Sequence, residues 1–205
     1  MVRQAHHYVA TPEAFVRDPD LVQKFYDERR AKLKTVHPNA AHQALARLDA
    51  KWPGDLLLVT QNVDDLHDRA GSKRLLHMHG ELNSAWCLAC DARTPFDGVM
   101  ATGPACPHCH QPGCLRPDIV WFGEMPYQMD RIEQALNRCD LFVSIGTSGA
   151  VYPAAGFVQT ARHHGARTLE INLDPSEDSF HFHESRMGRA GALVPDWVDE
   201  ILRDV

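Results

Sequence analysis

The chain has 205 residues, of which 44% are hydrophobic and 23% charged, and its formal net charge is −6. This composition is typical of a soluble globular protein, and an acidic balance without a Lys/Arg-rich segment argues against a general nucleic-acid binder. No apolar run approaches the roughly 18 residues of a membrane-spanning helix, and the N-terminus lacks the apolar core of a secretory signal. We therefore expect a cytoplasmic protein with neither nucleic-acid nor membrane partners, and favour a monomer.

Three helices are expected in the first quarter of the chain. Thr11-Pro12-Glu13 combines an N-cap with a first-turn proline and an acidic first turn. Asp18-Pro19-Asp20 opens a second helix, in which apolar residues recur at helical spacing as far as about Val36. Pro38-Asn39 opens the third helix.

Four short, continuously apolar runs have the pattern of strands buried on both faces of a parallel sheet. They lie at residues 56–59, 119–122, 141–145 and 168–172. A helix over about 154–164, ended by Gly165, connects the last two runs and makes a βαβ unit. A further helix is expected over 196–205. The sequence therefore predicts an α/β fold with a doubly wound parallel sheet.

Two Cys-x-x-Cys pairs are separated by fifteen residues: Cys87 with Cys90, and Cys106 with Cys109. Four thiolates at this spacing can surround one Zn²⁺ and leave no position for water, so the metal is expected to be structural. Cys114, His108 and His110 are near enough to be alternative ligands, and cysteines without a metal are the plainer alternative. We expect a zinc ribbon over 83–116, inserted into the α/β domain.

Polar segments near the predicted strands are candidates for chemistry. Gln61, Asn62 and Asp64 follow the first strand, where open α/β sheets bind ligands, although polar loops are common there. His79 precedes a glycine, and an imidazole at a strand end can act as a general base. Gly146–Gly149 (Gly-Thr-Ser-Gly) follows the third strand and offers N–H groups and hydroxyls to a phosphate or ribose, which alone is a weak signal.

Taken together, these segments resemble one family, the sirtuins, which are NAD-dependent protein-lysine deacylases. The motifs that carry the resemblance occur in the family's order: residues 61–64, His79-Gly80, the paired cysteines, residues 120–124, 146–148 and 171–173. The resemblance covers the chain from about Val9 to its end. It implies a Rossmann-like domain with a zinc subdomain, the cofactors NAD and Zn²⁺, and acyl-lysine proteins as substrates.

The resemblance also implies a role for each segment. The acyl oxygen of the substrate displaces nicotinamide from NAD, and His79 then acts as the base for a ribose hydroxyl. The products are free lysine, nicotinamide and an O-acyl-ADP-ribose. The implied cofactor-binding residues are Gln61, Asn62, Asp64, Gly146, Thr147, Ser148 and Asn172. The implied groove for the substrate backbone consists of Val120, Phe122, Gly123 and Glu124.

A second resemblance concerns the acyl group. Tyr26 and Arg29 match the Tyr-x-x-Arg signature of class III sirtuins, which prefer succinyl- and malonyl-lysine. Residues three apart share a helix face, so a guanidinium and a phenol can hold one carboxylate together. The alternative is a solvated helix with surface ion pairs. We expect removal of succinyl, malonyl and acetyl groups from protein lysines.

One family feature is not found in this sequence. Complete sirtuins begin with a buried strand, a Gly-Ala-Gly-x-Ser turn and a Phe-Arg loop at the NAD pyrophosphate, whereas no glycine precedes Gly54 here. We therefore expect residues 1–205 to form an N-terminally truncated sirtuin catalytic domain. The alternatives are a catalytically impaired remnant that acts as a zinc-bearing peptide-binding module and, less favoured by the acidic charge, a zinc-ribbon nucleic-acid binder.

Overall fold

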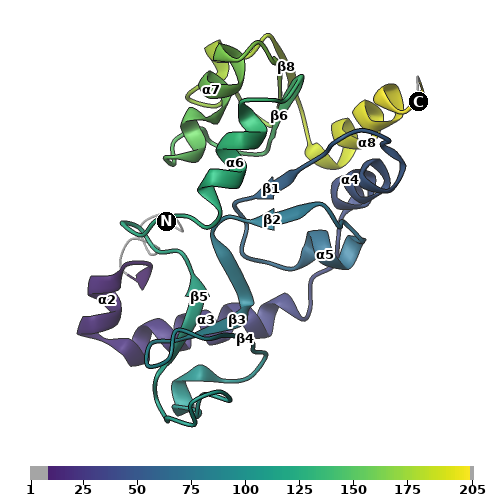
Figure 1. Ribbon diagram of the computed structural model, residues 1–205. Helices are drawn as coiled ribbons and strands as arrows, with labels where there is room; N and C mark the ends of the chain where they lie inside the picture. The colour runs from purple at the N-terminus through teal and green to yellow at the C-terminus, as the bar shows by residue number, and fades with distance from the viewer. Residues whose placement is uncertain (1–8, 204–205) are drawn as a thin grey trace. The chain divides into compact units, whose positions relative to one another are not determined.

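The computed structural model describes residues 9–203, so both ends of the predicted 1–205 domain lie outside the described residues. The chain forms two compact units (Figure 1). Within the described residues, unit 1 comprises 9–37, Val59–Leu66 and Leu76–Tyr127, and unit 2 comprises Pro38–Leu58, His67–Leu75 and 128–203. Over residues 9–203, no helix combines the length and hydrophobicity needed to cross a membrane.

Unit 1 begins with two helices, α2 (Pro12–Arg17) and α3 (Pro19–Leu33). Thr11 caps α2 and Asp18 caps α3, each accepting a backbone N–H from three residues ahead at 3.0 Å. Proline occupies the first turn of both helices, where its missing N–H removes no helical hydrogen bond. Both predicted helix starts are confirmed, and α3 ends at Leu33 rather than at about Val36.

The sheet of unit 1 is antiparallel, with β3 (Gly80–Cys87) between β4 (Arg93–Pro95) and β5 (Leu115–Ile119). The prediction of a parallel strand over 119–122 was wrong. Strand β5 ends at Ile119, and the chain turns after Trp121, whose N–H donates to the Glu124 carboxylate. The short 3₁₀ helix η1 (Met100–Thr102) lies between β4 and β5.

Helix α3 packs on this sheet through the apolar core of unit 1. The fully buried members of that core are Val9, Ala14, Val22, Tyr26, Leu33, Leu82, Ile119 and Trp121. Two aromatic rings are among them, which gives the core large contact areas from few residues.

A two-stranded sheet joins β1 (Leu58–Thr60) to β2 (Leu75–His77), with α5 (Leu66–Ala70) between them. The first predicted strand, 56–59, is thus displaced by about two residues. The N–H of Met78 donates to the Thr60 carbonyl at 3.1 Å. This bond brings the segment after β1 beside the segment after β2.

Unit 2 contains three parallel strands in the order β6-β7-β8: β6 (Leu141–Ile145), β7 (Arg167–Asn172) and β8 (Glu184–Met187). Between β6 and β7 lie η2 (Ala154–Gly156) and α7 (Phe157–His163), followed by Gly165 at φ 90°. The predicted βαβ unit is therefore confirmed. Strand β8, η3 (Ser179–His181) and α6 (Met129–Leu136) were not anticipated.

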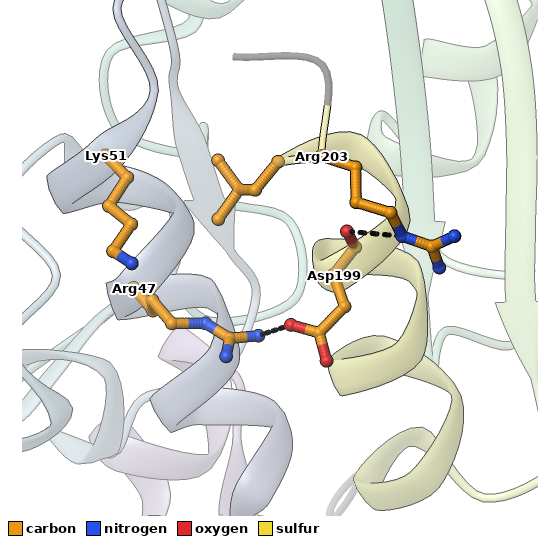
Figure 2. Close-up of a pocket in the computed structure, with 5 residues that line it drawn as sticks. Arg47, Lys51, Asp199 and Arg203 are labelled. Atoms are coloured by element: carbon orange, nitrogen blue, oxygen red, sulfur yellow. Dashed lines mark hydrogen bonds and ion pairs between the residues drawn. The ribbon is translucent and has the colours of Figure 1, made fainter.

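Helices α4 (Ala40–Lys51) and α8 (Ala190–Ile201) lie side by side in unit 2 (Figure 1). Asn39 caps α4, as predicted, and an ion pair joins Arg47 on α4 to Asp199 on α8 (Figure 2). Helix α8 begins six residues before the predicted start at residue 196, because it continues through Pro195.

Candidate functional site

His79 lies in the turn between β2 and β3, and its ring is held by the backbone. The Nδ1 atom is 3.1 Å from the carbonyl oxygen of Gln61. A carbonyl oxygen can only accept, so Nδ1 carries the hydrogen and Nε2 keeps a lone pair. Burial lowers the pKa of His79 below 6.5, and the bond to Gln61 opposes this in part. The imidazole is therefore neutral near pH 7 and able to take a proton at Nε2.

Gly80 is required by the close approach of β3 and β5. Its φ is 79°, and a Cβ atom there would lie 2.0 Å from the carbonyl oxygen of Asp118. Next to it, Val120 donates its N–H to the His79 carbonyl at 2.9 Å. Only glycine at position 80 leaves room for this close approach of the two strands, which fixes the backbone that carries the imidazole.

The polar loop after β1 contains the predicted residues Gln61, Asn62 and Asp64. Asn62 is exposed, and its N–H donates to the Thr60 hydroxyl at 3.1 Å. The Asp64 carboxylate accepts the N–H of Leu66 at 3.1 Å, so one of its oxygens starts α5. The structure thus brings Gln61 to His79 and gives Asp64 a local structural contact.

The predicted residues of unit 2 come together at the carboxyl ends of β6 and β7. Asn172 donates its side-chain N–H to the Thr147 carbonyl at 2.6 Å, and Gly146, at φ 65°, donates its N–H to Ile171 at 3.0 Å. Ser148 follows, with its carbonyl accepting from Glu177 at 3.0 Å. This edge of a parallel sheet is where α/β proteins bind ligands.

The four cysteines of the two pairs form one cluster in unit 1, with all four sulfur atoms within 4.8 Å of one another. The Cys87–Cys109 and Cys90–Cys106 sulfur distances are 3.7 and 3.8 Å. A tetrahedron with Zn–S bonds of about 2.3 Å has edges of about 3.8 Å, so the cluster fits one zinc ion. Cys114 lies 3.3 Å from Cys87, sulfur to sulfur, and donates to the Gln111 carbonyl.

Both cysteine pairs end in the same backbone conformation. The residue after each second cysteine, Asp91 or His110, has φ 61°, a left-handed value that Asp and His tolerate better than most residues. In the second pair, the N–H of His108 donates to the sulfur of Cys106 at 3.4 Å. These turns bring the cysteine sulfur atoms into one cluster and leave His108 and His110 exposed.

The predicted groove segment, residues 120–124, follows β5. Phe122 and Gly123 are exposed. The Glu124 carboxylate instead binds inside unit 1, with its two oxygens 2.7 and 3.0 Å from the Arg116 guanidinium. Glu124 therefore holds the segment in place through its side chain.

Tyr26 and Arg29 lie on α3, and Tyr26 is only 3% exposed. Burial raises the pKa of Tyr26 to about 12, so its hydroxyl stays protonated. The guanidinium of Arg29 lies 5.2 Å from the centre of the Phe25 ring. The alternative of a fully solvated helix face does not hold, because Arg30 is 1% exposed and pairs with Asp27 at 2.6 Å.

Sequence reasoning missed a polar cluster around the buried Asp118 of β5. Asp118 accepts from Ser84 at 2.9 Å and from Tyr127 at 2.7 Å, and Arg93 lies 3.3 Å away. Arg116, two residues before Asp118 in the sequence, is also buried. The signal was the run Leu115–Ile119, in which two charged residues stand among apolar ones and proline.

Comparison with known proteins agrees with this geometry. The model of the Sir2 family matches residues 2–153. The NAD-dependent protein deacylase of Vibrio vulnificus (strain YJ016) is 53% identical over 196 residues, which are 95% of this chain and 80% of the relative. A solved complex of a Sir2 homolog with NAD has a TM-score of 0.88 and 36% identity over 97% of this chain and 77% of that chain. Sir2Af2 bound to a myristoylated histone peptide has a TM-score of 0.80 and 31% identity, covering 96% and 85%.

The parallel α/β unit and the four-cysteine cluster define an α/β protein with a zinc-binding cysteine cluster. The chain belongs to the Sir2 family, the sirtuins. The deacylase relatives support its assignment to class III of that family.

Proposed function

We propose that this protein removes acyl groups from protein lysines in an NAD-dependent reaction. The curated relative is named for this activity, and solved relatives bind NAD or an acylated peptide. The observation that carries the proposal is the His79 ring, whose Nδ1 is held by the Gln61 carbonyl at 3.1 Å. That contact leaves Nε2 as a neutral base.

In the proposed reaction, an acyl-lysine, NAD and water give lysine, nicotinamide and an O-acyl-ADP-ribose. NAD supplies the ribose carbon that accepts the acyl oxygen and the nicotinamide that leaves. His79 accepts the proton of a ribose hydroxyl at Nε2. The rigid backbone around Gly80 keeps this nitrogen in one orientation, and such positioned bases contribute about 10²- to 10⁴-fold in rate.

Each of the two polar clusters is proposed to bind one part of NAD. Gln61, Asn62 and Asp64 bind the nicotinamide-ribose side. At the ends of β6 and β7, the ADP portion is bound by Gly146, Thr147, Ser148 and Asn172. The chemistry of these groups suits the ligand, because amide and hydroxyl side chains complement ribose hydroxyls and phosphates.

The substrate peptide is proposed to lie along residues 120–124. Val120 offers its carbonyl, because its N–H binds the His79 carbonyl, and Phe122 and Gly123 add an exposed aromatic ring and the Gly123 backbone. Glu124 supports this segment through Arg116. Tyr26 and Arg29 are proposed to bind the carboxylate of succinyl and malonyl chains, with the hydroxyl and the guanidinium as donors.

Zinc is proposed to be structural, held by Cys87, Cys90, Cys106 and Cys109 and stabilising the proposed 83–116 ribbon. A site of four thiolates has no open position, so no reaction step passes through the metal. Reduced thiolates are kept in reducing compartments, which supports the predicted cytoplasmic location. The prediction of a monomer stays a prediction.

The test is an assay of this 205-residue protein with matched succinyl-, malonyl- and acetyl-lysine peptides. Release of nicotinamide in proportion to deacylated peptide is the expected result, and the His79→Asn variant should release almost none. Peptide binding without nicotinamide release would instead support the zinc-bearing peptide-binding module. Equal turnover by His79→Asn would remove His79 as the base.

A further inference from the structure

Tyr26 and Trp121 share a buried hydrogen bond in unit 1. The indole Nε1 of Trp121 donates to the Tyr26 hydroxyl oxygen at 3.0 Å, and the two residues are 2% and 3% exposed. An indole N–H can only donate, so the phenolic oxygen is the acceptor here and its own hydrogen points elsewhere. No hydrogen bond donated by Tyr26 occurs among the described residues.

The indole of Trp121 is itself held on two sides. The guanidinium carbon of Arg116 lies 3.4 Å from the centre of the Trp121 ring. Glu124 binds Arg116 through both carboxylate oxygens and also accepts the backbone N–H of Trp121 at 2.8 Å. Buried side chains fixed in this way keep one orientation, so the N–H direction at Tyr26 is preset.

We propose that Trp121 is a positioning residue that selects acidic acyl groups by orienting the Tyr26 hydroxyl. The proposal rests on the proposed deacylase function. With its acceptor side occupied by Trp121, Tyr26 presents its hydrogen to the carboxylate of a succinyl or malonyl chain. Arg29, one helical turn along α3, supplies the second donor.

The reason for an orienting residue lies in the chemistry of a hydroxyl, which can rotate to donate or to accept. A hydroxyl whose oxygen faced a carboxylate would repel it. When the hydroxyl already points its hydrogen at the acyl site, the repulsive orientation is excluded, and no rotational freedom of the hydroxyl is lost during binding. An acetyl chain has no carboxylate, so it gains nothing from this arrangement.

The experiment replaces Trp121 by β-(3-benzothienyl)alanine, in which sulfur takes the place of the indole N–H in a ring of nearly the same shape. Trp121→Phe serves as a second variant. We expect KM for a succinyl-lysine peptide to rise about three- to tenfold, as loss of one neutral hydrogen bond predicts. The ratio of desuccinylation to deacetylation in kcat/KM should fall by the same factor, because kcat on the succinyl peptide changes little.

Two controls separate orientation from packing. In a Tyr26→Phe background the same replacement should no longer change the ratio, since the hydroxyl is absent. Trp52→Phe changes an indole that packs against the core of unit 2, and it should leave the ratio unchanged. A thermal unfolding measurement of each variant reports the folded fraction.

Equal losses on both peptides would overturn the proposal, because they indicate a purely structural role. A falling ratio in the Tyr26→Phe background would also overturn it, because Trp121 would then act without Tyr26. If the wild-type protein turned over neither peptide, the deacylase function would fail separately. Calorimetric Kd values for the two peptides would then make the same comparison without turnover.

Discussion

The two units of this sirtuin are stabilised by different interactions. Unit 1 buries the cations Arg30 and Arg116, which are 1% and 4% exposed and paired with carboxylates. Unit 2 also has an apolar core, with Ile171, Val194 and Val198 fully buried, and its buried Glu170 carboxylate is held by the hydroxyls of Ser179 and Ser185 instead of a cation. Unit 1 thus adds buried cations to its own apolar core. The difference teaches that replacing a buried arginine of unit 1 acts through a lost partner, whereas replacing an apolar residue of unit 2 acts through lost volume.

The largest effect is expected from removing the zinc ligands of unit 1. Cys90→Ser, or chelation, should unfold the β3–β5 region, because structural zinc contributes about 10–16 kcal/mol in small zinc-binding peptides, as much as a whole domain's stability. Hydrogen exchange, read separately for the two units, measures the loss. Cys114→Ser is the matched control and should keep one zinc per chain. Zinc retained by Cys109→Ser but lost in Cys114→Ser would make Cys114 the fourth ligand.

A second experiment separates chemistry in unit 1 from nucleotide binding in unit 2. His79→Asn should lower kcat about 10²- to 10⁴-fold and leave the Kd of NAD nearly unchanged. Asn172→Ala should raise that Kd about three- to tenfold and change kcat little, because it removes neutral hydrogen bonds. Calorimetry and steady-state kinetics provide both numbers. If each substitution changes kcat and the Kd of NAD by the same factor, the assignment of chemistry to His79 and nucleotide binding to Asn172 is contradicted.

A third experiment compares the two kinds of core. Arg116→Met should lower the free energy of unfolding by about 3 kcal/mol, because Glu124 loses its cation. Adding Glu124→Gln should recover part of that loss. In unit 2, Leu169→Ala should cost about 2–5 kcal/mol, as buried large-to-small substitutions do. Denaturant unfolding measures all three variants, and strictly additive losses at Arg116 and Glu124 would contradict the idea of a partner effect.

The smallest effect is expected from pH. Burial lowers the pKa of His79 below 6.5, and only the neutral imidazole accepts a proton. The kcat/KM value should therefore level off at pH values well above the lowered pKa and fall as the pH drops through it. The Kd of NAD should vary less over the same range, because Asn172 does not titrate. A midpoint above pH 6.5 for kcat/KM would contradict the buried, neutral state of His79.

Local signals predicted the starts of α2, α3 and α4, the cysteine cluster and the βαβ unit, because each depends on residues close together in the sequence. Thr11, Asp18 and Asn39 are caps whose acceptors serve the next turn of the chain. The 119–122 run misled because Ile119 ends an antiparallel strand, and Trp121 is buried just before the turn in which its N–H binds the Glu124 carboxylate. Periodicity contains no information about such a side-chain acceptor.

Sequence motifs predicted the residues of the candidate site, but they did not predict the contacts that support those residues. His79, Gly146 and Asn172 were named from the sequence, and their predicted roles stay predictions. The contact between Trp121 and Tyr26 joins residues 95 positions apart, so no local pattern contains it. Buried charges such as Arg116 also contradict the usual rule that arginine is exposed, which is why they were missed.

Gly80 has a consequence for how mutational data on this protein should be interpreted. Any side chain at this position would meet the Asp118 carbonyl oxygen, which lies 2.0 Å from where a Cβ would be. A saturation scan scored by activity should therefore mark Gly80 as intolerant as His79, although glycine offers no reactive group. Sensitivity at this site measures the space between two backbones, and a scan alone would count it as a second catalytic position.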